Sequence, residues 1–387
     1  MKNAAPAHLP ALDGVRALLA LAVAFYHLEI YKPIYEQARL PYLGGFVFAG
    51  HNAVVAFFAL SGMLITWLLL QERGRTGSVS IGTFYLKRVL RIWPVYYLVV
   101  GTGIYLLPHV AGLWIPDVHR ARALDMAGWE QGLYLTFFAN VFKIKAGWAV
   151  WYLLLNHAWS IGLEEQFYAV WPWLARLHTR LFMGTVVGII AVYGVARVAV
   201  FALGNPLAGT SFLSFFCADA MAWGALAGYT LHRLQTGTLP DRWRTRLQDK
   251  RLGLGIVAGA AALLFGLGTA MKFQLFLPVV AAWFSAALLV LALQPGLVPA
   301  LRWPVLQWLG RISYGLYMYN PLALVLTFTL LGWLGLGQAP FTAATTALYA
   351  ALGTGLTIGL AAISYYGMER RILRLRKAKR QEAIVPA

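Results

Sequence analysis

The chain has 387 residues, of which 60% are hydrophobic and 12% are charged, and its formal net charge is +18. Soluble domains carry about twice this share of charged residues, so the composition excludes an ordinary soluble protein. Apolar stretches of about 20 residues recur without the alternation of a membrane barrel. This pattern predicts an all-α protein that crosses a membrane several times. The single cysteine, Cys217, excludes a disulfide framework.

Basic residues gather in clusters between the apolar stretches. This distribution is typical of the cytoplasmic loops of membrane proteins. It favours contacts with anionic lipid headgroups and with phosphorylated ligands. We expect no nucleic-acid partner, because no basic soluble domain is visible. The clusters lie at 73–91, 176–180, 233–251, 302–311 and 370–380.

The apolar pattern predicts about ten membrane spans with both termini in the cytoplasm. The first segment lacks a cleavage site for a signal peptide and is expected to remain as a helix. The stretch 131–157 contains two halves that are each too short to cross, so we expect a re-entrant or interfacial hairpin there, between the third span and the fourth. The expected spans are 11–31, 49–70, 94–110, the helix containing WSIGLEEQFYAVWPWLA, 181–203, 211–231, 252–270, 275–293, 312–331 and 343–366.

No internal repeat, linker or second domain is visible. Residues 1–387 are therefore expected to form one membrane-embedded domain in the inner, cytoplasmic membrane. The basic tail, 370–387, is expected to lie on the inner leaflet. Prolines at 172, 278 and 321 fall inside predicted spans and should kink them.

The first span carries two ionisable residues, Arg16 and His27. Burying a charge in hydrocarbon is costly, so such residues usually have a function. They are eleven residues apart, or about three helical turns and 16 Å, and they share one helix face at two depths. This geometry suits a substrate that lies across the membrane. The alternative is that both side chains reach the polar surface at opposite helix ends.

Two carboxylates, Glu164 and Glu165, are expected at the depth of His27 on a helix of opposite direction. A histidine with a carboxylate on its far nitrogen is a tuned general base. Only one glutamate can face His27, since neighbouring residues point about 100° apart, and Glu164 is the favoured one. Alternatively, Glu165 caps a helix or pairs with an arginine, and His27 is a core histidine.

A basic group precedes Trp93 and Pro94 and contains Lys87, Arg88 and Arg91. Arg88 and Arg91 share a helix face, and Arg16 is expected on the same side of the membrane. Guanidinium groups bind phosphates in a bidentate manner, so the arginines can hold a phosphorylated carrier. Ordinary anchoring at the cytoplasmic surface is the alternative.

Arg197 and Asp219 lie on sequential antiparallel spans and are expected to form an intramembrane ion pair, for which a structural role is favoured over substrate binding. Ser160 fits a helix N-cap. No metal-binding motif or phosphate loop is present, so no metal is expected. Polar residues that could contribute to a substrate site are Asp13, His51, Asn52, Ser160 and Tyr168, and His157 lies near the expected outer mouth.

Several ordered blocks resemble the integral membrane acyltransferase family 3 over nearly the whole chain. LDGVRALLALAVAFYH resembles its first helix, with the arginine and histidine at the family's spacing. FFALSGMLITWLLL resembles its second helix, and FYLKRVLRIWPVYY carries its R-x-x-R pattern at Arg88 and Arg91. WSIGLEEQFYAVWP, GRISYGLYMYNPLAL and SYYGMERRI resemble its later blocks.

The resemblance implies transfer of an acyl group, usually acetyl, from acyl-CoA to a hydroxyl, most often on a carbohydrate or lipid-linked sugar. It implies that His27 is essential and that Arg16, Arg88 and Arg91 act near the coenzyme. Two departures are visible. Asn320 stands where the family often has a histidine, and Val55 and Ala56 replace an acidic residue of the second helix.

These observations predict a membrane O-acyltransferase, in which acyl-CoA enters from the cytoplasm and His27 takes the proton of the acceptor hydroxyl. Some relatives carry an additional soluble domain, so this chain is expected to act alone or with a separate protein. A transporter of acylated sugars or lipids is the alternative, although no inverted repeat is apparent. A structural scaffold would need no buried histidine site.

Overall fold

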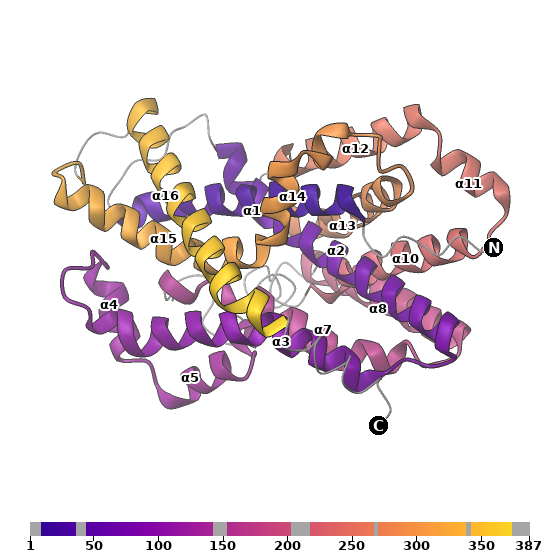
Figure 1. The fold of residues 1–387 in the computed structure, drawn as a ribbon, viewed down its shortest axis with the longest axis horizontal. Helices are drawn as coiled ribbons and strands as arrows, with labels where there is room; N and C mark the ends of the chain where they lie inside the picture. Colours follow the sequence, from indigo (N-terminus) through magenta and orange to yellow (C-terminus); the bar gives the residue numbers. More distant parts are fainter. Residues whose placement is uncertain are drawn as a thin grey trace, which may run out of the picture.

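A computed structural model describes residues 9–35, 44–141, 153–202, 217–266, 270–337 and 342–373, and in these residues every regular element is a helix (Figure 1). The longer helices are α1 (Pro10–Tyr31), α2 (Gly44–Thr76), α3 (Ile81–Gly101), α7 (Ala158–Leu174), α8 (Thr179–Ala202), α10 (Ala218–Gln235), α12 (Lys250–Gly266), α13 (Ala270–Leu293), α15 (Ser313–Trp333) and α16 (Ala343–Ser364). Short helices are α4 (Asp117–Leu124), α5 (Gly128–Leu135), α11 (Asp241–Leu247) and α14 (Pro304–Arg311). The all-α class predicted from composition is confirmed.

Seven helices within the described ranges are long and apolar enough to cross a membrane. The other three expected spans correspond to shorter helices. α7 and α12 have 17 residues each, and α10 has 18 residues that include Asp219 and Arg233. The protein is therefore a multi-pass membrane protein, while ten spans with both ends inside remains a prediction.

The third span differs from its predicted bounds. It was expected to begin after the basic stretch, but α3 begins at Ile81, so Lys87, Arg88 and Arg91 lie within the helix. Lysine and arginine are good helix formers, and a helix can place them on one side without breaking. The helix continues through Pro94 and ends in a π-helical turn at Thr102–Leu106.

The predicted hairpin at 131–157 lies partly outside the described residues, because 142–152 are not described. On either side, the structure has α5 and a 3-10 turn at Leu153–Leu155. Residues 374–387 of the basic tail also lie outside the described part. Both predictions stand untested. The prolines 172, 278 and 321 lie inside α7, α13 and α15, as predicted.

Helix α1 crosses the middle of the molecule and contacts α2, α14, α15 and α16 (Figure 1). It begins with Pro10 in its first turn, where the missing N–H costs nothing, and Asp13 in the same turn complements the positive end of the helix dipole. Most of its apolar residues are buried. A central helix with Arg16 and His27 therefore faces protein and not lipid.

Helices α2 and α10 pack with their backbones very close together, because glycines lie at the contact. A Cβ on Gly224 would lie 1.9 Å from the carbonyl oxygen of Ala59, and one on Gly228 would lie 2.3 Å from that of Met63. A Cβ on Gly62 would likewise lie 2.0 Å from the oxygen of Met221. Gly224 and Gly228 form a G-x-x-x-G pair, which lets helix backbones approach closely in membranes.

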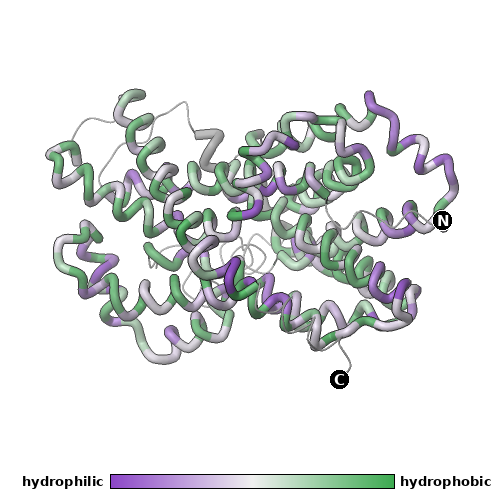
Figure 2. Tube along the Cα trace, viewed as in Figure 1, coloured by the Kyte–Doolittle hydropathy of each residue, from purple (hydrophilic) through white to green (hydrophobic). Residues whose placement is uncertain are grey.

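The outer surface is apolar along the described helices. On α8, the valines 192, 195 and 198 are 67%, 70% and 59% exposed. Figure 2 shows hydrophobic residues along most helices, with hydrophilic residues at helix ends and along α11. Such exposure would promote aggregation in water but suits contact with lipid chains.

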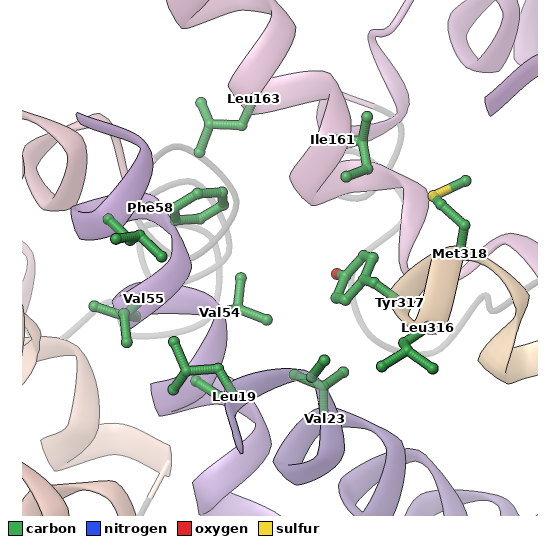
Figure 3. Close-up of a cluster of buried hydrophobic side chains, with 14 of the residues drawn as sticks. Leu19, Val23, Val54, Val55, Phe58, Ile161, Leu163, Leu316, Tyr317 and Met318 are labelled. Carbon is green, nitrogen blue, oxygen red and sulfur yellow. The ribbon is translucent and has the colours of Figure 1, made fainter. Parts of the chain in front are cut away.

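The core near the centre draws on four helices. Figure 3 shows Leu19 and Val23 from α1, Val54, Val55 and Phe58 from α2, Ile161 and Leu163 from α7, and Leu316, Tyr317 and Met318 from α15. All of the labelled residues are at most 8% exposed. Tyr317 is the polar member of this group, and its position leads to the site described next.

Candidate active site

A cavity with an empty volume of about 750 Å³ lies between α1, α2, α3, α7 and α15. Its polar lining residues are Arg16, Ser61, Arg88, Arg91, Ser160, Glu164, Tyr168, Ser313, Tyr314 and Tyr317. A second volume of about 640 Å³ shares Arg16, Ser61, Arg88, Arg91 and Tyr168 with the first. The two are parts of one cavity, which extends past Asp13 toward the start of α1 and the end of α2.

The three arginines predicted to lie together do line this cavity. Arg16 donates to Asp13 at 2.7 Å. The Arg88 guanidinium lies over the rings of Phe84 and Tyr168, at 5.5 Å and 5.2 Å. Its Nε is buried and has no hydrogen-bond partner. A cationic donor in this state is prepared to meet an anion.

Two of the predicted cofactor residues are both exposed but differ in placement. Arg91 is exposed on its helix yet reaches both cavity volumes. Lys87 is exposed too, but it is not among the residues that line either volume. The helix geometry explains the difference, since Lys87 is one residue from Arg88 and points about 100° away from it. A role for Lys87 at the cavity gains no support from this placement.

Helix α7 presents a polar stripe to the cavity, formed by Ser160, Glu164 and Tyr168. These residues follow each other at intervals of four, so they share one helix face. Glu164 accepts hydrogen bonds from Ser61 at 2.7 Å and from Tyr168 at 3.1 Å. Three candidate residues from the sequence thus come together beside the arginines.

The structure corrects the predicted pairing of His27 with a glutamate. Glu164 bonds to Ser61 and Tyr168, and Glu165 accepts from Trp93 Nε1 at 3.1 Å. Counting residues from the helix ends gave similar depths but not the direction in which α7 points its side chains. Its polar face turns the Glu164 carboxylate toward the arginines and not toward the imidazole.

His27 has another partner, Asn320 on α15. The distance from His27 Nδ1 to Asn320 Oδ1 is 2.8 Å. Asn320 Nδ2 in turn donates to Thr357 Oγ1 at 3.2 Å, and the Thr357 hydroxyl donates to the carbonyl of Gly353 at 2.7 Å. Because this order of donors leaves the amide oxygen to accept, Nδ1 carries the proton. In the neutral ring, Nε2 then holds the lone pair and can act as a base.

Tyr317 separates His27 from the cavity. His27 is 5% exposed and is not among the residues that line either volume. Tyr317 lines the cavity, and its ring centre is 6.5 Å from that of His27. Its hydroxyl lies 2.6 Å from Ser160 Oγ. Figure 3 shows the Tyr317 side chain extending from α15 toward Phe58 and Val54.

The predicted ion pair is confirmed, and two other candidates lie on its side of the fold. Arg197 donates to Asp219 at 3.0 Å, and both side chains are 1% exposed. His51 stacks against Trp159, with ring centres 6.4 Å apart. Asn52 donates to the carbonyl oxygens of Leu263 and Leu264 on α12. These four residues do not line the arginine cavity. The placement of the cavity therefore gives no support to a role for them in substrate binding.

Two further details differ from the sequence analysis. Ser160 is not the N-cap of its helix, because α7 is capped by His157 and the Ser160 hydroxyl donates back to the His157 carbonyl at 3.0 Å. The contribution of Asn320 was missed, although its position had been noted as a departure from the family pattern. Within the described ranges, no group of three potential metal ligands occurs.

Comparison with known proteins adds to this geometry. The family model of an acyltransferase domain, family 3, matches residues 9–366. The chain belongs to acyltransferase family 3. A putative peptidoglycan O-acetyltransferase of Bacillus subtilis is 25% identical over 348 residues, which are 83% of this chain and 49% of the relative. No solved structure matches the chain.

Two further relatives are named as O-acetyltransferases. The peptidoglycan O-acetyltransferase OatA of Listeria monocytogenes is 26% identical over 349 residues, which are 83% of this chain and 50% of the relative. A putative O-acetyltransferase of Staphylococcus aureus is 32% identical over 168 residues, which are 43% of this chain and 24% of the relative. The chain spans about half the length of the Bacillus and Listeria relatives.

Proposed function

We propose that the chain is a membrane-embedded O-acyltransferase, which moves an acyl group, acetyl in the simplest case, from acyl-CoA to a sugar hydroxyl. One observation carries the proposal: a single cavity joins three arginines to a wall formed by Tyr317, and behind this wall lies a histidine whose Nδ1 is fixed by an amide. Family membership and the names of the relatives support the same reaction class.

The donor is held through its phosphates. Arg16, Arg88 and Arg91 offer planar, permanently charged groups that match phosphate oxygens. The free Nε of Arg88 and the exposed side chain of Arg91 are the first contacts available to an entering anion. The start of α1 and the end of α2, where the cavity extends, are then the cytoplasmic side. The pantetheine arm would follow the α7 stripe toward Tyr317.

His27 acts as the general base. Its Nε2 removes the proton of the acceptor hydroxyl while the hydroxyl oxygen attacks the thioester carbonyl. The tetrahedral intermediate then expels the CoA thiolate, which takes the proton from the imidazolium and leaves as the free thiol. A positioned base of this kind contributes about 10²–10⁴-fold to a rate. Asn320 holds the ring in the tautomer that this step requires.

The thioester has to pass Tyr317 to reach His27. The Tyr317 hydroxyl contacts Ser160 and the His157 carbonyl at the start of α7, and a change of rotamer would break these contacts. Ser160 and Tyr317 therefore line the last part of the donor path. Glu164 stands one turn further back along α7 and places a carboxylate beside the arginines, where it limits the excess of positive charge.

The names of the relatives support a carbohydrate acceptor. Two of them are named for peptidoglycan, a sugar polymer outside the cytoplasmic membrane. We propose a surface glycan or a lipid-linked sugar as the acceptor, reached from the side opposite the arginines. The protein would then lie in the cytoplasmic membrane with its donor site inside.

Mass spectrometry of cell-envelope glycans tests this proposal. Cells expressing the wild-type chain should carry acetyl esters that are missing from cells expressing His27→Ala at equal protein level. The His178→Gln variant alters an exposed histidine and serves as the matched control. Identical ester content with wild type and H27A would contradict the proposal, and would leave a transporter or scaffold as the better account.

A further inference from the structure

A second histidine, His157, lies beside His27 and has no role in the reaction described so far. It occupies the N-cap position of α7, directly after the turn at Leu153–Leu155. Its side chain is buried, with 2% exposure; the ring approaches the Met318 backbone, but neither ring nitrogen makes a well-formed hydrogen bond. A buried N–H without a partner is costly, so native proteins rarely keep one without a reason.

The two imidazole rings lie close together. Their ring centres are 6.3 Å apart and their planes are inclined by 68°. The Tyr317 ring lies 5.5 Å from His157 and 6.5 Å from His27, so it borders both. The Ser160 hydroxyl, which contacts Tyr317, donates to the His157 carbonyl. His157 is thus fixed by the same elements that close the donor cavity.

The hydrogen-bonding capacity of the pair is complementary. Asn320 accepts a hydrogen bond from the Nδ1–H of His27, which leaves a lone pair on Nε2. A neutral His157 has one N–H and one lone pair, and neither makes a well-formed hydrogen bond in the structure. A hydroxyl group can donate to the first ring and accept from the second at the same time. A carbonyl oxygen can only accept, so it would satisfy only one ring.

We propose that His157 is a second hydrogen-bonding residue for the acceptor hydroxyl, with its ring N–H donating to the oxygen whose proton passes to His27. This inference rests on the proposed function and assigns an additional substrate contact to it. Two hydrogen bonds of about 2.8 Å to one oxygen fit between rings at the observed separation.

The attack of the acceptor hydroxyl breaks one bond to hydrogen and forms one bond to carbon. The acceptor O–H bond breaks as its proton moves to His27 Nε2, and the new C–O bond forms at the thioester carbon. His157 keeps its own proton throughout and gains or loses nothing. Its contribution is orientation, because a hydroxyl held at two points directs its proton to the base and its lone pair to the carbon.

The test uses the purified full-length protein in lipid nanodiscs, with acetyl-CoA as donor and peptidoglycan fragments as acceptor. His157→Leu should lower kcat/KM for the acceptor by about 10²-fold, while the KM for acetyl-CoA changes less than about twofold. His157→Gln keeps an N–H donor and should recover part of the loss. His178→Gln, at an exposed position, is the matched control and should behave as wild type.

The outcomes separate this inference from the proposed function. An active wild type with an equally active H157L variant would overturn the inference alone. So would a loss that glutamine does not relieve and that accompanies a lower thermal midpoint, since it would assign His157 to packing. An equal rise in KM for donor and acceptor would also overturn it. A wild type that never transfers acetyl would contradict the proposed function and the inference with it.

Discussion

At the scale of single residues, the orientation of the His27 ring depends on its hydrogen-bond partner. Asn320 is 293 positions away in sequence and accepts from Nδ1, while Thr357 accepts from the Asn320 amide. This chain of buried hydrogen bonds fixes both the tautomer and the orientation of the ring. An amide carries no charge, so it orients the base without stabilising its protonated form as a carboxylate would.

Replacing Asn320 should therefore slow the chemical step more than it weakens binding. We expect Asn320→Leu to lower kcat by about 10²-fold with little change in KM for acetyl-CoA, because His27 loses its preferred tautomer. Thr357→Val should cause a smaller loss, since it acts through Asn320. Steady-state kinetics of the purified variants check this order.

Thr327→Val provides the matched control for the threonine variant. Thr327 is also buried, but its hydroxyl donates to the Ala323 carbonyl of its own helix. Near wild-type kcat for T327V, together with losses for T357V and N320L, would support the role of the Thr357–Asn320 hydrogen bonds in orienting His27. Full activity of N320L would show that the amide does not orient the base.

The arginines give a second prediction at this scale. Arg88→Ala combined with Arg91→Ala should weaken CoA binding by about 10-fold or more, because charge-assisted hydrogen bonds to phosphate are lost. Lys87→Ala removes a neighbouring positive charge that does not line the cavity, and it should leave the affinity within about twofold. Calorimetric titration of CoA into each variant measures these affinities. Equal effects of all three substitutions would point to surface charge alone.

At the scale of helices, the sequence predicts which residues share one face of a helix. The spacing of Arg16 and His27 on one helix and of Ser160, Glu164 and Tyr168 on another does follow from the helical repeat. The direction that each helix faces does not, because it is set by contacts between distant segments. The His27–Asn320 bond joins α1 to α15, and no local pattern contains it. The start of α3 was misplaced since basic residues were taken to lie outside a span.

The α2–α10 crossing supplies a prediction about stability. Gly224→Val would place a side chain where the Ala59 carbonyl already lies, so the helices must separate. Overpacking of this kind costs about 1–3 kcal/mol, and we expect a lower thermal midpoint by intrinsic tryptophan fluorescence. Gly188→Ala on α8 meets nothing within 4 Å and should not lower the midpoint. Equal midpoints for both variants would contradict the close crossing.

At the scale of the whole molecule, the helices arrange charge and catalyst along one path. Arginines line the cavity near the start of α1, the α7 stripe follows, and Tyr317 closes the end next to His27 and His157. Apolar surfaces such as that of α8 keep this path inside the membrane. This arrangement supports the proposal that an acyl group is taken from a donor on one side and meets a hydroxyl near the other.

We propose that this path delivers an acyl group to a hydroxyl with His27 as the base. The most direct measurement is release of free CoA thiol from acetyl-CoA by the purified full-length protein, with and without peptidoglycan fragments. We predict release that depends on the acceptor and falls by about 10²-fold or more in His27→Ala. Release that is independent of the acceptor, or equal in wild type and H27A, would contradict the account.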